Sequence, residues 1–111
     1  MPSRKRTYAR YTLAATEFLG TLIRTERKSR GFSEKEMAER LGVSRGTLQR
    51  LEKGDPKIAL GAAFEACALL NIPLFNEDSP GLDRRTNEMN KRLALLPTRV
   101  RSSTLKVSDD F

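Results

Sequence analysis

Apolar side chains recur at spacings of three and four residues along the first part of the chain. Leu19, Leu22 and Ile23 stand at positions i, i+3 and i+4, and Phe18 widens the same stripe. This spacing is typical of an amphipathic α-helix that packs one face against a core. The pattern predicts a helix over residues 12–29 with Phe18 on its buried side.

A shorter helix is predicted directly after the first one. Ser33 and Glu36 have the spacing of a capping box, in which the hydroxyl and the carboxylate each satisfy a backbone N–H of the first turn. The following residues predict a helix over 34–41. Gly42 then ends it, because glycine readily adopts the positive φ that a tight turn between helices needs.

A third helix is predicted to begin after Ser44, which is a second N-cap residue, and to end near Lys53. Its inward stripe is short and consists of Thr47 or Leu48, followed by Leu51. The opposite face carries mostly polar positions: Arg45, Gly46, Gln49 and Arg50. Two short helices joined by a glycine turn, the second with an outward polar face, are the arrangement of a helix-turn-helix.

The second half of the chain predicts two further helices. Residues 60–71 are apolar on nearly every side, so we expect this helix to be mostly buried. Residues 76–81 have the composition of a loop. Residues 82–96 predict a fifth helix with a narrow apolar stripe surrounded by charge, which favours a docked or dimer-forming helix: Leu82, Met89, Leu93 and Leu96.

These elements predict an all-α fold, a five-helix bundle that contains the helix-turn-helix. We expect a flexible basic arm over residues 1–10 and a DNA-binding domain over residues 11–75. Residues 76–111 would supply the loop, the fifth helix and a polar C-terminal tail for dimerisation or partner binding.

Composition argues against an enzyme or a metal protein. The 111 residues include no histidine and one cysteine, so the commonest general base and metal ligand is missing and a zinc site is not expected. No phosphate-binding or nucleophile motif occurs, and no cofactor is predicted.

Cys67 is expected to be a small buried residue, and a single cysteine favours a reducing cytoplasm. No apolar run approaches the roughly 20 residues of a membrane span.

The charge favours a polyanionic partner. The formal net charge is +7 and the isoelectric point is about 10.1. Residues 1–10 carry four basic side chains and no acid, whereas residues 33–53 carry five basic and four acidic side chains. The helix-turn-helix is therefore expected to read sequence, while much of the non-specific attraction comes from the basic ends or from doubling in a dimer.

Residues 32–54, FSEKEMAERLGVSRGTLQRLEKG, resemble the helix-turn-helix of the phage-repressor and Cro class, the XRE family. The matching positions lie in register without a gap: Ala38, Gly42, Val43, Ser44 and the ending Leu51-Glu52-Lys53-Gly54. The resemblance covers roughly residues 15–72 and implies a lambda-repressor-like bundle. In that fold the second helix of the motif enters the major groove of double-stranded DNA.

The resemblance implies roles for individual residues. Base-reading positions are Ser44, Arg45, Gly46, Thr47, Gln49 and Arg50. Expected phosphate contacts are Ser33, Lys35 and Lys53. A separate hypothesis is that Arg4, Lys5 and Arg6 of the basic arm also contact phosphates. The alternative is that the arm is a tail that only aids solubility. Arg27 and Glu52 match a partly buried ion pair. Glu34 departs from the pattern, because the family often has a glutamine there and a carboxylate cannot donate to a phosphate.

The resemblance also implies a homodimer that reads a palindromic operator. The stretch of residues 54–61 and the basic segment of residues 96–101 resemble HipB-type antitoxins, the partners of HipA-like kinase toxins. This implies a repressor of its own operon that also binds a kinase toxin. Two alternatives stay open: a stand-alone or phage transcription regulator without a toxin, and a protein–protein adaptor that keeps the fold without reading bases. RNA binding is disfavoured, since no aromatic stacking platform is present.

Overall fold

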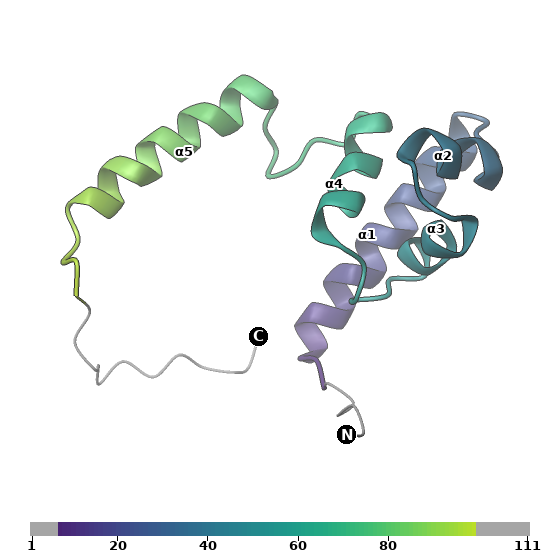
Figure 1. Ribbon diagram of the computed structural model, residues 1–111, viewed down its shortest axis with the longest axis horizontal. Coiled ribbons are helices and arrows are strands. Elements are labelled where there is room, and N and C mark those ends of the chain that lie inside the picture. Colours follow the sequence, from purple (N-terminus) through teal and green to yellow (C-terminus); the bar gives the residue numbers. More distant parts are fainter. Residues whose placement is uncertain (1–6, 100–111) are drawn as a thin grey trace. The chain divides into compact units, whose positions relative to one another are not determined.

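The computed structural model describes residues 7–99, which divide into two compact units, one ending at Ile72 and the other beginning at Pro73. By their residue ranges, four helices belong to the first unit and one to the second, and Figure 1 labels them in chain order. Over the described residues there are five α-helices and no strand, which confirms the predicted all-α fold. The helices are α1 (Arg10–Ser29), α2 (Glu34–Leu41), α3 (Arg45–Glu52), α4 (Leu60–Leu69) and α5 (Ser79–Ala94).

The core of the first unit lies between α1, α2, α3 and α4. The short helix α3 packs against both α1 and α2, and α2 also contacts α4. Cys67 is completely buried, as the sequence predicts, and burial raises the pKa of its thiol. The buried apolar residues are Ile23, Met37, Ala38, Leu48, Leu51, Ala63, Ala66, Cys67 and Leu70.

Helices α1 and α3 approach each other closely at Gly20. A Cβ atom at this position would lie 2.7 Å from the carbonyl oxygen of Glu52 and closer still to that of Leu51. Only glycine fits this contact without a shift of one backbone. The close approach brings the C-terminal turn of α3 directly against α1.

Two expectations about buried faces are wrong. Phe18 is 69% exposed, because the buried residues of α1 follow the stripe Gly20, Ile23 and Arg27, and Phe18 projects from the opposite side. Helix α4 is not buried on most sides. Its apolar composition serves one inward face, and Leu60 on the other is 68% exposed.

Helix α5 begins earlier than predicted. The loop expected over residues 76–81 ends at Asp78, whose carboxylate accepts a hydrogen bond of 2.8 Å from the backbone N–H of Gly81. Pro80 lies in the first turn, where a missing N–H breaks no helical hydrogen bond. Proline and glycine at this point therefore open a helix, although their composition alone indicates a loop.

Candidate nucleic-acid interface

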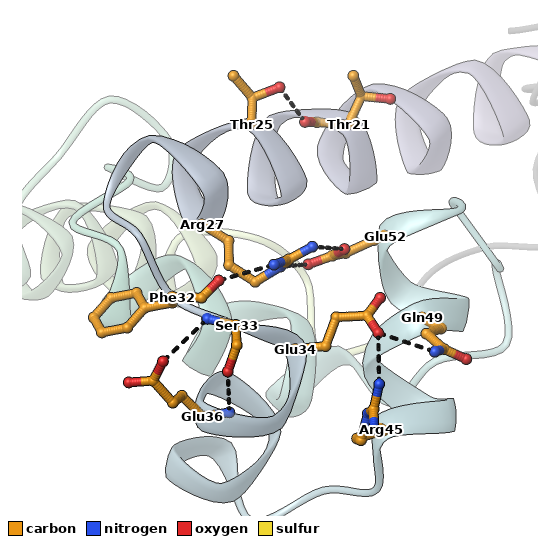
Figure 2. A network of polar contacts seen from close by, with 10 residues as sticks. All are labelled: Thr21, Thr25, Arg27, Phe32, Ser33, Glu34, Glu36, Arg45, Gln49 and Glu52. Carbon is orange, nitrogen blue, oxygen red and sulfur yellow. Dashed lines mark hydrogen bonds and ion pairs between the residues drawn. The ribbon is translucent and has the colours of Figure 1, made fainter.

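Two serine caps and one glycine fix the start of α2 and the turn that leads from α2 to α3. The Ser33 Oγ accepts a hydrogen bond of 3.0 Å from the Glu36 N–H, and the Glu36 carboxylate accepts one of 3.3 Å from the Ser33 N–H. This is the capping box that the sequence predicts (Figure 2). Gly42 ends α2 at a φ of +69°, and the Ser44 Oγ accepts from the Thr47 N–H at 3.0 Å. Both ends of the turn are therefore set by local chemistry.

Helix α3 has two faces of opposite character. Leu48, Leu51 and Glu52 are buried against α1 and α2. The long polar side chains of the outward face are exposed: Arg45, Gln49 and Arg50. With 3.6 residues per turn, Arg45 and Gln49 stack one turn apart, and Arg50 lies beside them. The core thus holds α3 from beneath and leaves three hydrogen-bonding side chains pointing outward.

The remaining expected base-reading positions surround the start of α3. The Ser44 hydroxyl also donates to the Thr47 hydroxyl at 3.0 Å, so these two side chains are tied together. At Gly46 a Cβ atom would meet only the Ser44 Oγ, at 3.8 Å. This exposed position leaves open space on the helix surface, where another backbone can come close.

Glu34, at the start of α2, reaches across to α3. Its Oε1 atom accepts hydrogen bonds from Nη2 of Arg45 at 3.3 Å and from Nε2 of Gln49 at 3.1 Å (Figure 2). The hydrogen bonds from Gln49 and Arg45 lower the pKa of the Glu34 carboxyl below its ordinary value. The Glu34 carboxylate therefore joins two of the outward side chains of α3.

Arg50 is held in a similar way from the other end of α3. Its Nε atom donates to the Asp55 carboxylate at 2.8 Å, and Asp55 also accepts a hydrogen bond from the Lys57 N–H at 2.8 Å. These contacts, with the Arg50 bond the stronger cause, lower the pKa of Asp55. All three long polar side chains of the outward face thus bond to a carboxylate of the same molecule.

Behind α3, Arg27 and Glu52 form a buried pair. Arg27 donates from Nε to one carboxylate oxygen at 2.6 Å and from Nη2 to the other at 3.0 Å (Figure 2). A third donor, Nη1, bonds to the backbone oxygen of Phe32 at 2.9 Å. Only 5% of Arg27 and 7% of Glu52 remain exposed. The hydrogen bond with Glu52 raises the pKa of Arg27, so this guanidinium stays charged.

The expected phosphate-contact residues Ser33, Lys35 and Lys53 are all exposed. Arg4, Lys5 and Arg6 lie outside the described residues. A pocket of about 210 Å³ beside α3 brings two further side chains into the site: Arg24 of α1 and Glu34 line it together with Gln49, Glu52 and Lys53. Sequence reasoning missed Arg24 because it lies on α1, outside the helix-turn-helix. Only the packing of α1 against α3 lets Arg24 line the same pocket as Lys53.

No group of three metal-ligating side chains occurs among residues 7–99. No helix in that part of the chain is long and apolar enough to span a membrane.

The comparisons with known proteins agree with this geometry. Residues 23–75, slightly less than half of the chain, match the family model described as "Helix-turn-helix". The match contains α2, the turn, α3 and α4 in full.

Several curated relatives carry a name of the same kind. Proteins named "Uncharacterized HTH-type transcriptional regulator" from Sinorhizobium medicae and Rhizobium meliloti are each 32% identical over 65 residues, which is 57% of this chain and 47% of theirs. One from Methanothermobacter thermautotrophicus is 56% identical over 34 residues, 31% of this chain and 49% of its own. The chain thus spans about half the length of these relatives. No solved structure matches it significantly.

Proposed function

We propose that this chain is a sequence-specific transcriptional repressor that binds double-stranded DNA through α3. The observation that carries the proposal is the division of α3 into a buried face and a face that presents Arg45, Gln49 and Arg50 to solvent. A single helix fits a major groove about 12 Å wide, where base pairs differ in their donors and acceptors. The naming of the relatives as transcriptional regulators supports the same function.

The outward side chains have the chemistry for base recognition. Arg45 and Arg50 each carry a guanidinium that can donate two parallel hydrogen bonds to guanine O6 and N7. The Gln49 amide can pair with adenine, and the Thr47 methyl can contact thymine. Ser44 lies at the helix start, and Gly46 leaves room for close approach of the DNA.

Phosphate contacts would orient the helix in the groove. Ser33 and Lys35 lie at the start of α2, and Lys53 lies at the end of α3 with Arg24 lining the same pocket. Basic side chains placed on both sides of the recognition helix can contact the backbones that border the groove. In the full chain, the arm residues Arg4, Lys5 and Arg6 would add to this attraction.

Selection of bound DNA from a random pool tests the proposal. We expect enrichment of one sequence, and Arg45→Ala or Arg50→Ala should each cost about 1–3 kcal/mol of discrimination at defined base pairs. Binding of the selected and scrambled duplexes gives the values, and unchanged circular dichroism shows that the fold is intact. A pool that yields no preferred sequence from a folded protein would instead favour the protein–protein adaptor.

Lys53→Ala is the matched control, because it removes one positive charge next to the same helix without removing a base reader. It should weaken the selected and scrambled duplexes about equally and reduce the salt dependence of log K by about one unit. Equal behaviour of the Lys53 and Arg45 variants would contradict the assignment of Arg45 to a base edge.

The proposal extends to a homodimer on a palindromic operator. One α3 covers only a half-site, and two-fold symmetry in a protein is matched by symmetry in its site. The apolar stripe predicted for the fifth helix supports this: Met89 and Leu93 of α5, and Leu96 just after its end, are each more than half exposed in the single chain. Ultracentrifugation of the full chain and the symmetry of the selected sequence test it.

The finer assignment is an antitoxin that represses its own operon and binds a HipA-like kinase. It is supported by the resemblance of residues 54–61 and 96–101 to HipB-type proteins. Co-purification with a kinase encoded next to it is the expected result. A repressor that binds its operator and has no such neighbour would be a stand-alone or phage regulator.

A further inference from the structure

Glu34 lies at a place where a DNA-binding surface would ordinarily avoid an acid. It is the first residue of α2, about one third of its side chain is exposed, and its carboxylate faces the outward side of α3. DNA bound to α3 would bring phosphates close to this end of α2, and like charges repel. A carboxylate here therefore lowers the affinity for every duplex. It is useful only if its contacts improve another property of the interface.

The hydrogen bonds of Glu34 link it to two polar side chains of α3. One oxygen atom accepts from Arg45 and from Gln49, which are the two side chains of one ridge of α3. Arg45 and Gln49 each use one N–H group to bond Glu34. The other four N–H groups of the guanidinium, and the second N–H and the carbonyl oxygen of the amide, remain available. Arg45 and Gln49 are thereby joined through one carboxylate oxygen of Glu34 (Figure 2), and both side chains are exposed.

We propose that Glu34 determines the specificity of the interface by keeping Arg45 and Gln49 joined unless matching base edges replace or complement its carboxylate. This inference rests on the proposed DNA binding by α3. A non-cognate duplex offers Arg45 no bidentate partner, so the arginine stays with Glu34 and the carboxylate repels the phosphates. A cognate duplex supplies paired acceptors and overcomes both effects, and specificity is this difference between the two affinities.

The charged and polar groups around Glu34 indicate which side chains a substitution of Glu34 would affect first. Arg45 and Gln49 face it from α3, Arg27 of α1 adds an attractive charge, and Arg24, Glu52 and Lys53 line the same pocket. Arg27 and Glu52 are already paired with each other. Arg45 is the one cation within hydrogen-bonding distance of Glu34 in the described part of the chain, so a change at Glu34 acts first on Arg45 and Gln49.

Glu34→Gln in the full chain tests the proposal, because the substitution keeps the size of the side chain and removes its charge. We expect binding of a scrambled duplex to tighten about 5- to 20-fold and binding of the selected duplex to change less than about threefold, so discrimination falls. The matched control is Glu39→Gln, which removes the same charge from an exposed position on another side of α2.

A second measurement examines the contact without DNA. The side-chain amide resonances of Gln49 should shift in Glu34→Gln and in Glu34→Ala but not in Glu39→Gln, while the backbone spectrum reports an unchanged fold. Equal effects of the Glu34 and Glu39 variants on both duplexes would overturn the proposal and leave only a net-charge effect. If the unmodified chain selects no sequence, the proposed function itself fails, and that result precedes any variant.

Discussion

The two faces of α3 carry the same kind of chemistry in opposite surroundings. On the inner face, Arg27 and Glu52 are almost completely buried and share two hydrogen bonds, with a third from Arg27 to Phe32. On the outer face, Glu34 joins Arg45 and Gln49, and Asp55 holds Arg50, all at positions that water reaches.

Burial decides what each of these arginine–carboxylate contacts can do. Separating a buried pair leaves a charge without water or a partner, so the inner pair fixes how α3 sits on α1. Separating an exposed pair costs little, because water replaces the partner. The outer contacts can therefore be exchanged for contacts to a ligand, whereas the inner contact serves as part of the framework.

The largest expected effect comes from breaking the inner pair. Arg27→Ala leaves the Glu52 carboxylate buried and unpaired, and we expect a loss of about 3–5 kcal/mol in the free energy of unfolding. Chemical denaturation measures it. Arg50→Ala is the matched control on the outer face and should cost no more than about 1 kcal/mol. Similar losses in the two variants would show that burial does not separate the two faces.

A smaller effect is expected from moving the two helices apart. Gly20→Ala places a methyl group against the carbonyl oxygens of Leu51 and Glu52, so α1 or the end of α3 must shift. The cost of such overpacking is about 1–3 kcal/mol, and it should also disturb the Arg27–Glu52 geometry. Thermal unfolding measures the loss. Gly61→Ala is a suitable control, since its Cβ would meet nothing within 4 Å.

The smallest effect is expected from acid. The pKa of Glu34 lies below its ordinary 4.5 and that of Asp55 below its ordinary 3.8, so both stabilise the folded chain above those values and lose this contribution as the pH falls through the lowered pKa. Because water reaches both carboxylates, which are partly exposed, we expect the unfolding free energy to change little. The Gln49 side-chain amide should report the titration of Glu34. A Gln49 amide that titrates at or above pH 4.5 would contradict the contact.

Much of the fold could be predicted because its signals are local. The capping box of Ser33 and Glu36, the Ser44 cap and Gly42 at positive φ each act within a few residues, and the structure has all of them. The stripes that bury Leu48 and Leu51 follow from helical spacing. The earlier start of α5 was not predicted because the Asp78 cap outweighs a loop-like composition. The exposure of Phe18 was not predicted because the neighbouring helices decide which side of α1 is buried.

The candidate site divides in the same way. Helical periodicity and capping were enough to predict α3 as a short capped helix with Arg45, Gln49 and Arg50 outward, because neither signal needs a distant partner. Three features depend on how the helices pack: the close approach of α1 and α3 at Gly20, the pocket that Arg24 and Lys53 both line, and the hydrogen bonds from Arg45 and Gln49 to Glu34. Those contacts depend on how separate helices cross, and the spacing of residues within one helix carries no such information.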